Sequence, residues 1–205
     1  MRPPDELTLG HGGGPEARTS TGLDNVKVGM WAFLGSECLF FGALITTYLL
    51  YRGRTAGGPA PSEIYDIPFT SVSSFVLLMS SLTMVLALAA IQRGDHVRTR
   101  VWLFSTAMLG ATFIGGQVYE FTTFVNEGLS LSVSAFGSAF FVLTGFHGAH
   151  VTVGILMLLT LFAMSLGGRL PSERAQTVEM VGLYWHFVDI VWIVIFTLVY
   201  LIPGD

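Results

Sequence analysis

The sequence predicts an all-α integral membrane protein, a bundle of five transmembrane helices. Of its 205 residues, 52% are hydrophobic and only 12% are charged, whereas a soluble domain carries about 25% charged residues. Mean hydropathy is +0.64. Five apolar runs are each long enough for about 20 residues of helix, the length that crosses a hydrocarbon core of about 30 Å. A small soluble protein lacks the surface to cover five such runs, and no basic patch indicates a nucleic-acid partner.

The chain divides into a tail at 1–25 and one transmembrane domain at 26–205. The tail is polar, contains three consecutive glycines and three prolines, and is expected to be flexible. It lacks the basic and apolar regions of a signal peptide, so no cleavage is expected. The predicted helices are 26–51, 69–91, 101–124, 134–166 and 180–202. The fourth is longer than a span requires and is expected to tilt or project from the bilayer.

The distribution of Lys and Arg predicts the orientation, because cytoplasmic loops carry more of them. The tail, the second loop and the fourth loop hold most of these residues, whereas the first and third loops hold only Arg52 and Arg54. The larger set is Arg2, Arg18, Lys27, Arg93, Arg98, Arg100, Arg169 and Arg174. We therefore expect a cytoplasmic N-terminus and a periplasmic C-terminus.

Seven carboxyl, imidazole or amide side chains lie inside the apolar runs, where an unpartnered polar group is costly. They are Glu37, Gln117, Glu120, His147, His150, His186 and Asp189. Glu37 falls about 16 Å into its helix, near the bilayer centre, because a helix rises about 1.5 Å per residue. We expect Glu37 to be protonated or hydrogen-bonded to His147 or His150, which lie near the middle of their own span.

Spacing predicts which of these groups face the same way. His147 and His150 are three residues apart and are expected to share a helical face. The same spacing relates His186 to Asp189, so that Asp189 would hold or orient the imidazole. Five further residues are predicted to serve helix packing. They are Gly145, Gly148 and Ala149, whose small size lets another helix come close, together with Trp185 and Trp192.

These residues do not match known metal sites. Carboxylates on two helices with a His-x-x-His pair superficially resemble a di-iron bundle, but that class uses Glu-x-x-His motifs on two helices. The His-Glu-x-x-His motif of zinc proteases is also absent from the sequence. Buried histidines bonded to carboxylates and hydroxyls are therefore the favoured interpretation. The one cysteine, Cys38, cannot form an intrachain disulfide and is expected to be a small buried apolar residue.

Three motifs resemble those of subunit III of haem-copper terminal oxidases. They are SECLFF at 36–41, GFHGAHV at 145–151 and YWHFVDIVW at 184–192. The segment GSAFF at 137–141 and the pair Gln117 and Glu120 also fit the family. The resemblance extends from about residue 27 to residue 203, and its last motif is highly specific. Many members have seven helices, and this chain lacks the first two, as several bacterial oxidases do.

The resemblance implies a non-catalytic subunit, with haem and copper held by partner subunits. The residues agree with this, since only three histidines lie in the membrane and one cysteine cannot form the dinuclear copper site of subunit II. The implied role is to stabilise the catalytic subunit and to support proton uptake from the cytoplasmic side while dioxygen is reduced to water. The implied location is the bacterial cytoplasmic membrane.

The implied partners are subunit I as the main contact, subunit II, a small subunit IV and membrane lipids, with no nucleic acid. A structural phospholipid is a candidate ligand. In seven-helix members, however, a lipid-filled cleft lies between the first two helices and the rest. Without those helices, another subunit would have to supply that wall.

The electron donor is the least determined part of this interpretation. Gln117 and Phe146 match cytochrome c oxidases of aa3 or caa3 type, where quinol oxidases tend to have Glu and Thr. The segment TAGGP at 55–59, with PF at 68–69, instead resembles five-helix quinol oxidases. We favour cytochrome c and keep subunit III of a quinol oxidase as the alternative.

A protein of another class would use similar residues. In a small proton-coupled transporter, Glu37, His147 and Asp189 would form a proton relay. Discontinuous helices or inverted internal repeats would favour that class, and the sequence shows neither.

Overall fold

The computed structural model describes residues 25–56 and 65–202, and every regular element within those ranges is helical. The elements in chain order are α1 (Asn25–Tyr51), α3 (Ile67–Gln92), α4 (His96–Asn126), α5 (Ala135–Leu166), the short η1 (Ser172–Arg174), α6 (Ala175–Phe196) and the π-helical η2 (Thr197–Leu201). Apart from Asn25, the predicted tail lies outside the described residues, as do positions 57–59 of the segment compared with quinol oxidases.

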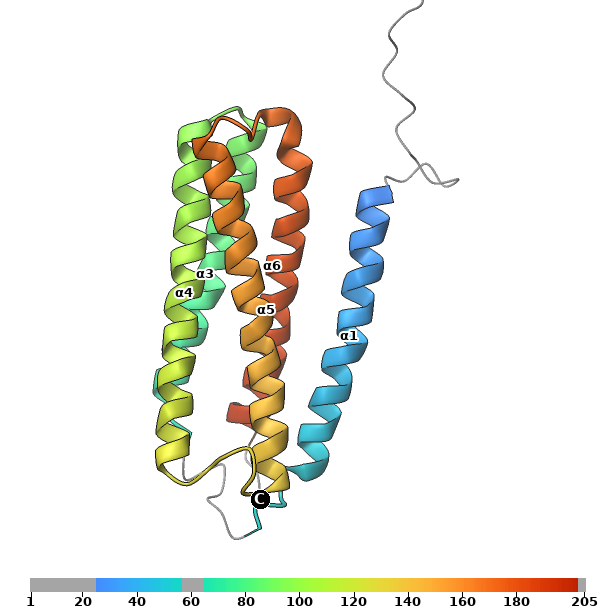
Figure 1. Ribbon diagram of the computed structural model, residues 1–205, viewed down its shortest axis with the longest axis vertical. Coiled ribbons are helices and arrows are strands. Elements are labelled where there is room, and N and C mark those ends of the chain that lie inside the picture. The colour runs from blue at the N-terminus through green and yellow to red at the C-terminus, as the bar shows by residue number, and fades with distance from the viewer. Residues whose placement is uncertain (1–24, 57–64, 203–205) are drawn as a thin grey trace, which may run out of the picture.

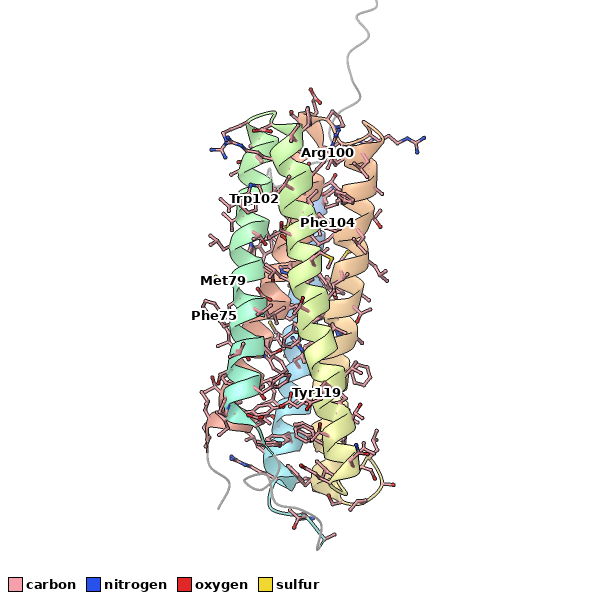
Figure 2. The ribbon with its side chains drawn as sticks, turned by 90° about the vertical axis from the view of Figure 1, so that its left-hand side faces the viewer. Phe75, Met79, Arg100, Trp102, Phe104 and Tyr119 are labelled. Carbon is pink, nitrogen blue, oxygen red and sulfur yellow. The ribbon has the colours of Figure 1, made fainter. Side chains whose placement is uncertain are left out.

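Five helical stretches in the described part of the chain are long and apolar enough to cross a membrane, with lengths of 27, 26, 31, 32 and 30 residues. Their outer faces are apolar: Leu39, Val72 and Tyr119 are 79%, 66% and 64% exposed. Phe75 and Met79 project from α3 away from the bundle (Figure 2). The prediction of an all-α bundle with five spans is confirmed.

Side-chain caps fix where three of the helices begin. Asp66, Asp95 and Ser134 each accept a hydrogen bond from the backbone N–H three positions later, at 3.0–3.1 Å. Such a cap satisfies one of the free donors at a helix start. As a result α3 begins at Ile67 rather than at 69, and α4 begins at His96 rather than at 101. The first turn of α4 is polar, so its apolar pattern starts later than the helix, whereas α3 begins with the apolar Ile67 and Pro68, two residues before the predicted start.

Four helices form a ring, and α1 packs on its outside. In the ring α3 lies beside α4, α4 beside α5, α5 beside α6, and α6 beside α3. Helix α1 makes its main contacts with α5 and α6. It stands to one side of the ring in Figure 1. Its buried residues are Leu34, Phe41 and Tyr48, at heptad spacing. The helix is therefore attached to the ring along one narrow stripe.

Two buried tryptophans of α6 are bonded to serines of α3. The indole N–H groups of Trp185 and Trp192 donate to the hydroxyls of Ser80 and Ser74, at 2.9 and 2.8 Å. Because hydrocarbon offers no hydrogen-bond partner, these bonds favour the pairing of the two helices. Both tryptophans pack between helices.

Gly110 and Gly154, which the sequence pattern did not indicate, make room for Trp185. A Cβ atom on Gly110 of α4 would lie 2.5 Å from the indole ring, and one on Gly154 of α5 would lie 2.7 Å from it. Any larger residue would overlap the fully buried ring. These two positions therefore let α4 and α5 close around α6.

Candidate functional site

Glu37 of α1 and His150 of α5 form a polar contact between α1 and the ring. Glu37 Oε2 lies 3.2 Å from His150 Nε2, and the two side chains are only 17% and 19% exposed. The ring of Phe41 packs edge-on against the imidazole, with 5.1 Å between centroids. Of the two histidines expected as partners for Glu37, His150 is the one that the structure places there.

The hydrogen bonds around His150 define the proton content of this pair. Its Nδ1 lies 2.8 Å from the carbonyl oxygen of Phe146. A carbonyl oxygen can only accept, so Nδ1 carries a hydrogen. Nε2 then either accepts from a protonated Glu37 or donates to its carboxylate as part of an imidazolium. In both cases the contact holds one proton and the pair is uncharged overall, which lowers the cost of burying it in a membrane.

A cavity of about 550 Å³ lies beside the pair, between α1 and the edge formed by α5 and α6. Its lining is mostly apolar and includes Met30, Phe33 and Phe146, and Glu37 and His150 form part of its wall. The cavity can therefore hold an apolar group and offers it one polar contact.

His147 points into the ring rather than toward α1. It is fully buried, and its Nε2 donates to the carbonyl oxygen of Val188 at 3.2 Å. Its ring lies between those of Phe113 and Trp192, at centroid distances of 5.9 and 4.8 Å. A step of three residues turns a helix by about 60°, enough to direct His147 to α6 and His150 to α1. Both rings nevertheless pack against Phe41 of α1, at centroid distances of 6.5 and 5.1 Å, as residues on one helical face do, and only their hydrogen-bond partners differ.

Ser81 of α3 joins His186 and Asp189 of α6. Its hydroxyl donates to Asp189 Oδ2 and lies 3.0 Å from His186 Nδ1. A hydroxyl has one hydrogen, which Asp189 receives, so His186 Nδ1 is the donor to Ser81. Asp189 thus orients His186 through the serine and not directly. Ser81 could not be picked out from the sequence, because a serine in a helix ordinarily bonds its own backbone.

Gln117 of α4 meets α5 beside Gly148. A Cβ atom on Gly148 would lie 3.0 Å from Gln117 Oε1, so the glycine permits this approach. The amide of Gln117 donates to the carbonyl oxygen of Thr144 over a long 3.5 Å. Ala149 lines the large cavity. At Gly145 a Cβ atom would meet no other atom within 4 Å. The prediction that this glycine lets another helix come close is therefore wrong.

Glu120 lies near the end of α4 and is only 6% exposed. The hydroxyl of Thr70, in the first turn of α3, donates to its Oε1 at 2.5 Å. Tyr65, two residues before the start of α3, packs on Tyr200 of η2 with 4.6 Å between ring centroids. Burial raises the pKa of the Tyr65 hydroxyl well above its ordinary value. This end of the bundle therefore buries the Glu120 carboxyl near a pair of tyrosine rings, with Arg52 close to Tyr65.

The family model and the relatives that match this chain all describe subunit III of an oxidase. A model of the family described as cytochrome c oxidase subunit III matches residues 15–203. The chain is 40% identical over 187 residues to cytochrome c oxidase subunit 3 of Bacillus sp. (strain PS3), covering 91% of this chain and 90% of the relative. It is also 40% identical over 186 residues to quinol oxidase subunit 3 of Bacillus subtilis (strain 168), covering 91% of each.

The chain belongs to the cytochrome c oxidase subunit III family. It is therefore subunit III of a haem-copper oxidase, an integral membrane protein that associates with other oxidase subunits. A third relative, cytochrome bo(3) ubiquinol oxidase subunit 3 of Pseudomonas aeruginosa, is 40% identical over 177 residues, with 86% of this chain and 85% of the relative covered. Membership of this family stands against the proton-coupled transporter.

The polar groups of this subunit III form separate contacts, each between a different pair of helices. Glu37 joins α1 to α5, His147 joins α5 to α6, and His186 with Asp189 joins α6 to α3. The contacts of Gln117 and Glu120 join α4 to α5 and to α3. The arrangement holds neighbouring helices together and does not form a continuous relay.

Within residues 25–56 and 65–202, no three His, Cys, Asp or Glu side chains lie close enough to hold a metal ion. Cys38 is exposed on α1, which corrects the expectation of a buried position. It is one residue from Leu39, the most exposed of the apolar residues of α1. The helix stripe buried against the ring is too narrow to cover this face.

Proposed function

We propose that this subunit III is the non-catalytic, stabilising subunit of a proton-pumping cytochrome c oxidase of aa3 or caa3 type in a bacterial cytoplasmic membrane. Subunit I would be its main neighbour, with subunit II and a small subunit IV alongside. Haem and copper would lie in subunits I and II, where dioxygen is reduced to water. A contribution to proton uptake from the cytoplasmic side is proposed from the family resemblance alone.

The observation that carries the stabilising role is the use of the three membrane histidines. His147 bonds a backbone carbonyl, His150 bonds a carboxyl group and His186 bonds a serine. Each bond ties two helices together. Histidines that join neighbouring helices support a structural part for the chain, because breaking such a bond would leave a polar group in the membrane without its partner.

We also propose a phospholipid chain as the occupant of the cavity of about 550 Å³ beside Glu37. The apolar lining favours hydrocarbon, and the open position between α1 and the ring would admit it from the bilayer. Mass spectrometry of lipids that remain with the purified complex would test this. The cavity variant Val153→Trp should reduce the amount retained.

Cytochrome c is the proposed electron donor, supported by Gln117 and Phe146. A quinol is the second candidate, because quinol oxidase subunits are as similar to this chain as the cytochrome c oxidase subunit is. The deciding experiment is to purify the complex through a tag on this chain and to measure oxygen uptake with reduced cytochrome c and with a quinol. Cytochrome c turnover is expected. Uptake with the quinol alone would reverse the choice, and a preparation without haem would refute both.

A further inference from the structure

The outer seam between α3 and α6 presents a polar group at mid-membrane depth. His186 lies midway along the 30-residue span Ser172–Leu201. Its side chain is only partly buried, and no residue in the described ranges bonds its Nε2. Since Nδ1 donates to Ser81, the Nε2 of a neutral His186 is a hydrogen-bond acceptor. An acceptor directed at lipid tails would lose the hydrogen bond that water or protein provides.

The surroundings of His186 on this seam are apolar. On α6 the neighbouring turn carries Ile190, which is 59% exposed, and Leu183 is half-buried. Across the seam on α3, Leu82 and Val85 are 54% and 50% exposed. We call these four residues, with His186, the α3–α6 seam. One acceptor within an apolar strip is the pattern expected where a second helix covers it, because helices in membranes associate by close packing and single polar contacts.

A notch beside His186 gives the seam a shape as well as a polar group. It has a volume of about 70 Å³ and lies between α3 and two turns of α6. It is lined by Met84, Val85, Leu88, Glu179, Gly182, Leu183 and His186. Gly182 leaves it open, since a Cβ atom there would lie 3.2 Å from the end of the Met84 side chain. The notch is of the size of one small side chain.

We infer that the α3–α6 seam is the docking surface for a transmembrane helix of another subunit of the same oxidase. That helix brings a hydrogen-bond donor opposite His186 Nε2 and a small side chain into the notch. The inference rests on the proposed function, which supplies the membrane-embedded partner. A lipid chain has no donor, and a second copy of this chain would place one acceptor against another.

The test is photocrosslinking in the membrane-embedded oxidase. A photoreactive amino acid replaces Ile190 on the seam or, as the matched control, Leu156 on the outer face of α5, which is also 59% exposed. The Ile190 probe is expected to form an adduct with another oxidase subunit. Adducts with lipid only, a dimer of this chain or no adduct at Ile190 would each overturn the inference. Haem that co-purifies with the chain tests the proposed function separately.

A second measurement uses the imidazole itself. His186→Leu removes the acceptor, and about a fivefold loss of the subunit from the purified complex after a detergent wash is expected for one lost hydrogen bond. His186→Gln keeps an acceptor and a donor to Ser81 and should restore retention. A lipid-facing seam predicts the opposite, since leucine is the better residue in hydrocarbon. Full retention of His186→Leu would therefore contradict docking here.

Discussion

Glu37 and His150 hold a single proton between two side chains on helices far apart in the sequence. The carbonyl oxygen of Phe146 makes this arrangement definite, because it requires the hydrogen on Nδ1 and leaves Nε2 for Glu37. A group able to donate to Nε2 can therefore replace the carboxyl without disturbing its surroundings. An apolar group cannot.

Substitution of Glu37 separates a structural from a proton-carrying role. Glu37→Gln keeps a donor for His150 Nε2 and should preserve assembly and most of the initial oxidase activity. Glu37→Leu leaves the imidazole unsatisfied, at a cost of about 1–3 kcal/mol, and should weaken retention of the subunit. Oxygen uptake and subunit content are measured for both. Loss of oxygen reduction in an intact Glu37→Gln complex would make Glu37 an obligatory proton carrier.

The close contact between Gly110 and Trp185 gives a prediction, and Gly115 on the same helix α4 serves as its control. Gly110→Ala would bring a methyl group to within 2.5 Å of the indole, whereas Gly115→Ala meets no atom within 4 Å. Overpacking of a rigid buried ring should destabilise the chain by about 1–3 kcal/mol, and the Gly115 variant should match the parent. SDS-induced unfolding of the purified chain measures both. Equal stability of the two variants would show that the ring relaxes freely.

At the scale of single helices, α1 differs from the other four. It meets the ring through Leu34, Phe41 and Tyr48, and one ion pair of 2.9 Å joins Lys27 to Glu179 near its start. That pair is partly exposed and contributes little, as surface ion pairs do. Besides the Glu37–His150 contact, the attachment of α1 therefore depends on packing around Phe41, which touches the rings of His147, His150 and Phe187.

Phe41→Ala is expected to loosen α1 selectively. The loss of stability should be about 2 kcal/mol, less than for a full Phe→Ala change in a soluble protein. The reason is that lipid surrounds an unpacked helix, so only the lost packing and not transfer to water contributes. Leu39→Ala on the exposed side of the same helix is the control. Unfolding midpoints in SDS should fall for Phe41→Ala only. A similar fall for both variants would mean that α1 is held by its whole surface.

The helices could be predicted from the sequence because length and apolar content determine a membrane span. Their starts at Ile67 and His96 could not, since the side-chain caps of Asp66 and Asp95 set them and not the apolar pattern. For the site, spacing along one helix does not say which neighbour each side chain meets. His147 and His150 diverge for that reason, and Ser81 and Gly154 gain their importance only from what α6 places against them.

For the whole molecule, an odd number of spans puts the two ends of the described chain on opposite sides of the bundle. The connection from α3 to α4 and that from α5 to α6 lie at the end where α1 begins (Figure 1). The arginines of these connections therefore gather at one end, and the excess of Lys and Arg in cytoplasmic loops predicts that this is the cytoplasmic end.

Reporter fusions test this orientation. A reporter fused after Asp205 should read as periplasmic, and one inserted in the loop at Asp95 should read as cytoplasmic. The physical reason is that Lys and Arg near short loops resist transfer across the membrane. Alkaline phosphatase and green fluorescent protein fusions give complementary signals. The reverse pattern would contradict the charge count and the family alignment together.

The attachment of α1 also has a consequence for biogenesis. Its polar partner His150 follows Glu37 by 113 residues in the chain. At about 5–20 residues per second, synthesis takes roughly 6–23 s to reach that histidine. During this interval the first helix has neither the His150 imidazole nor its packing surface on α5 and α6. A chaperone or insertase that shelters an isolated polar helix would therefore act on this nascent chain at its first span.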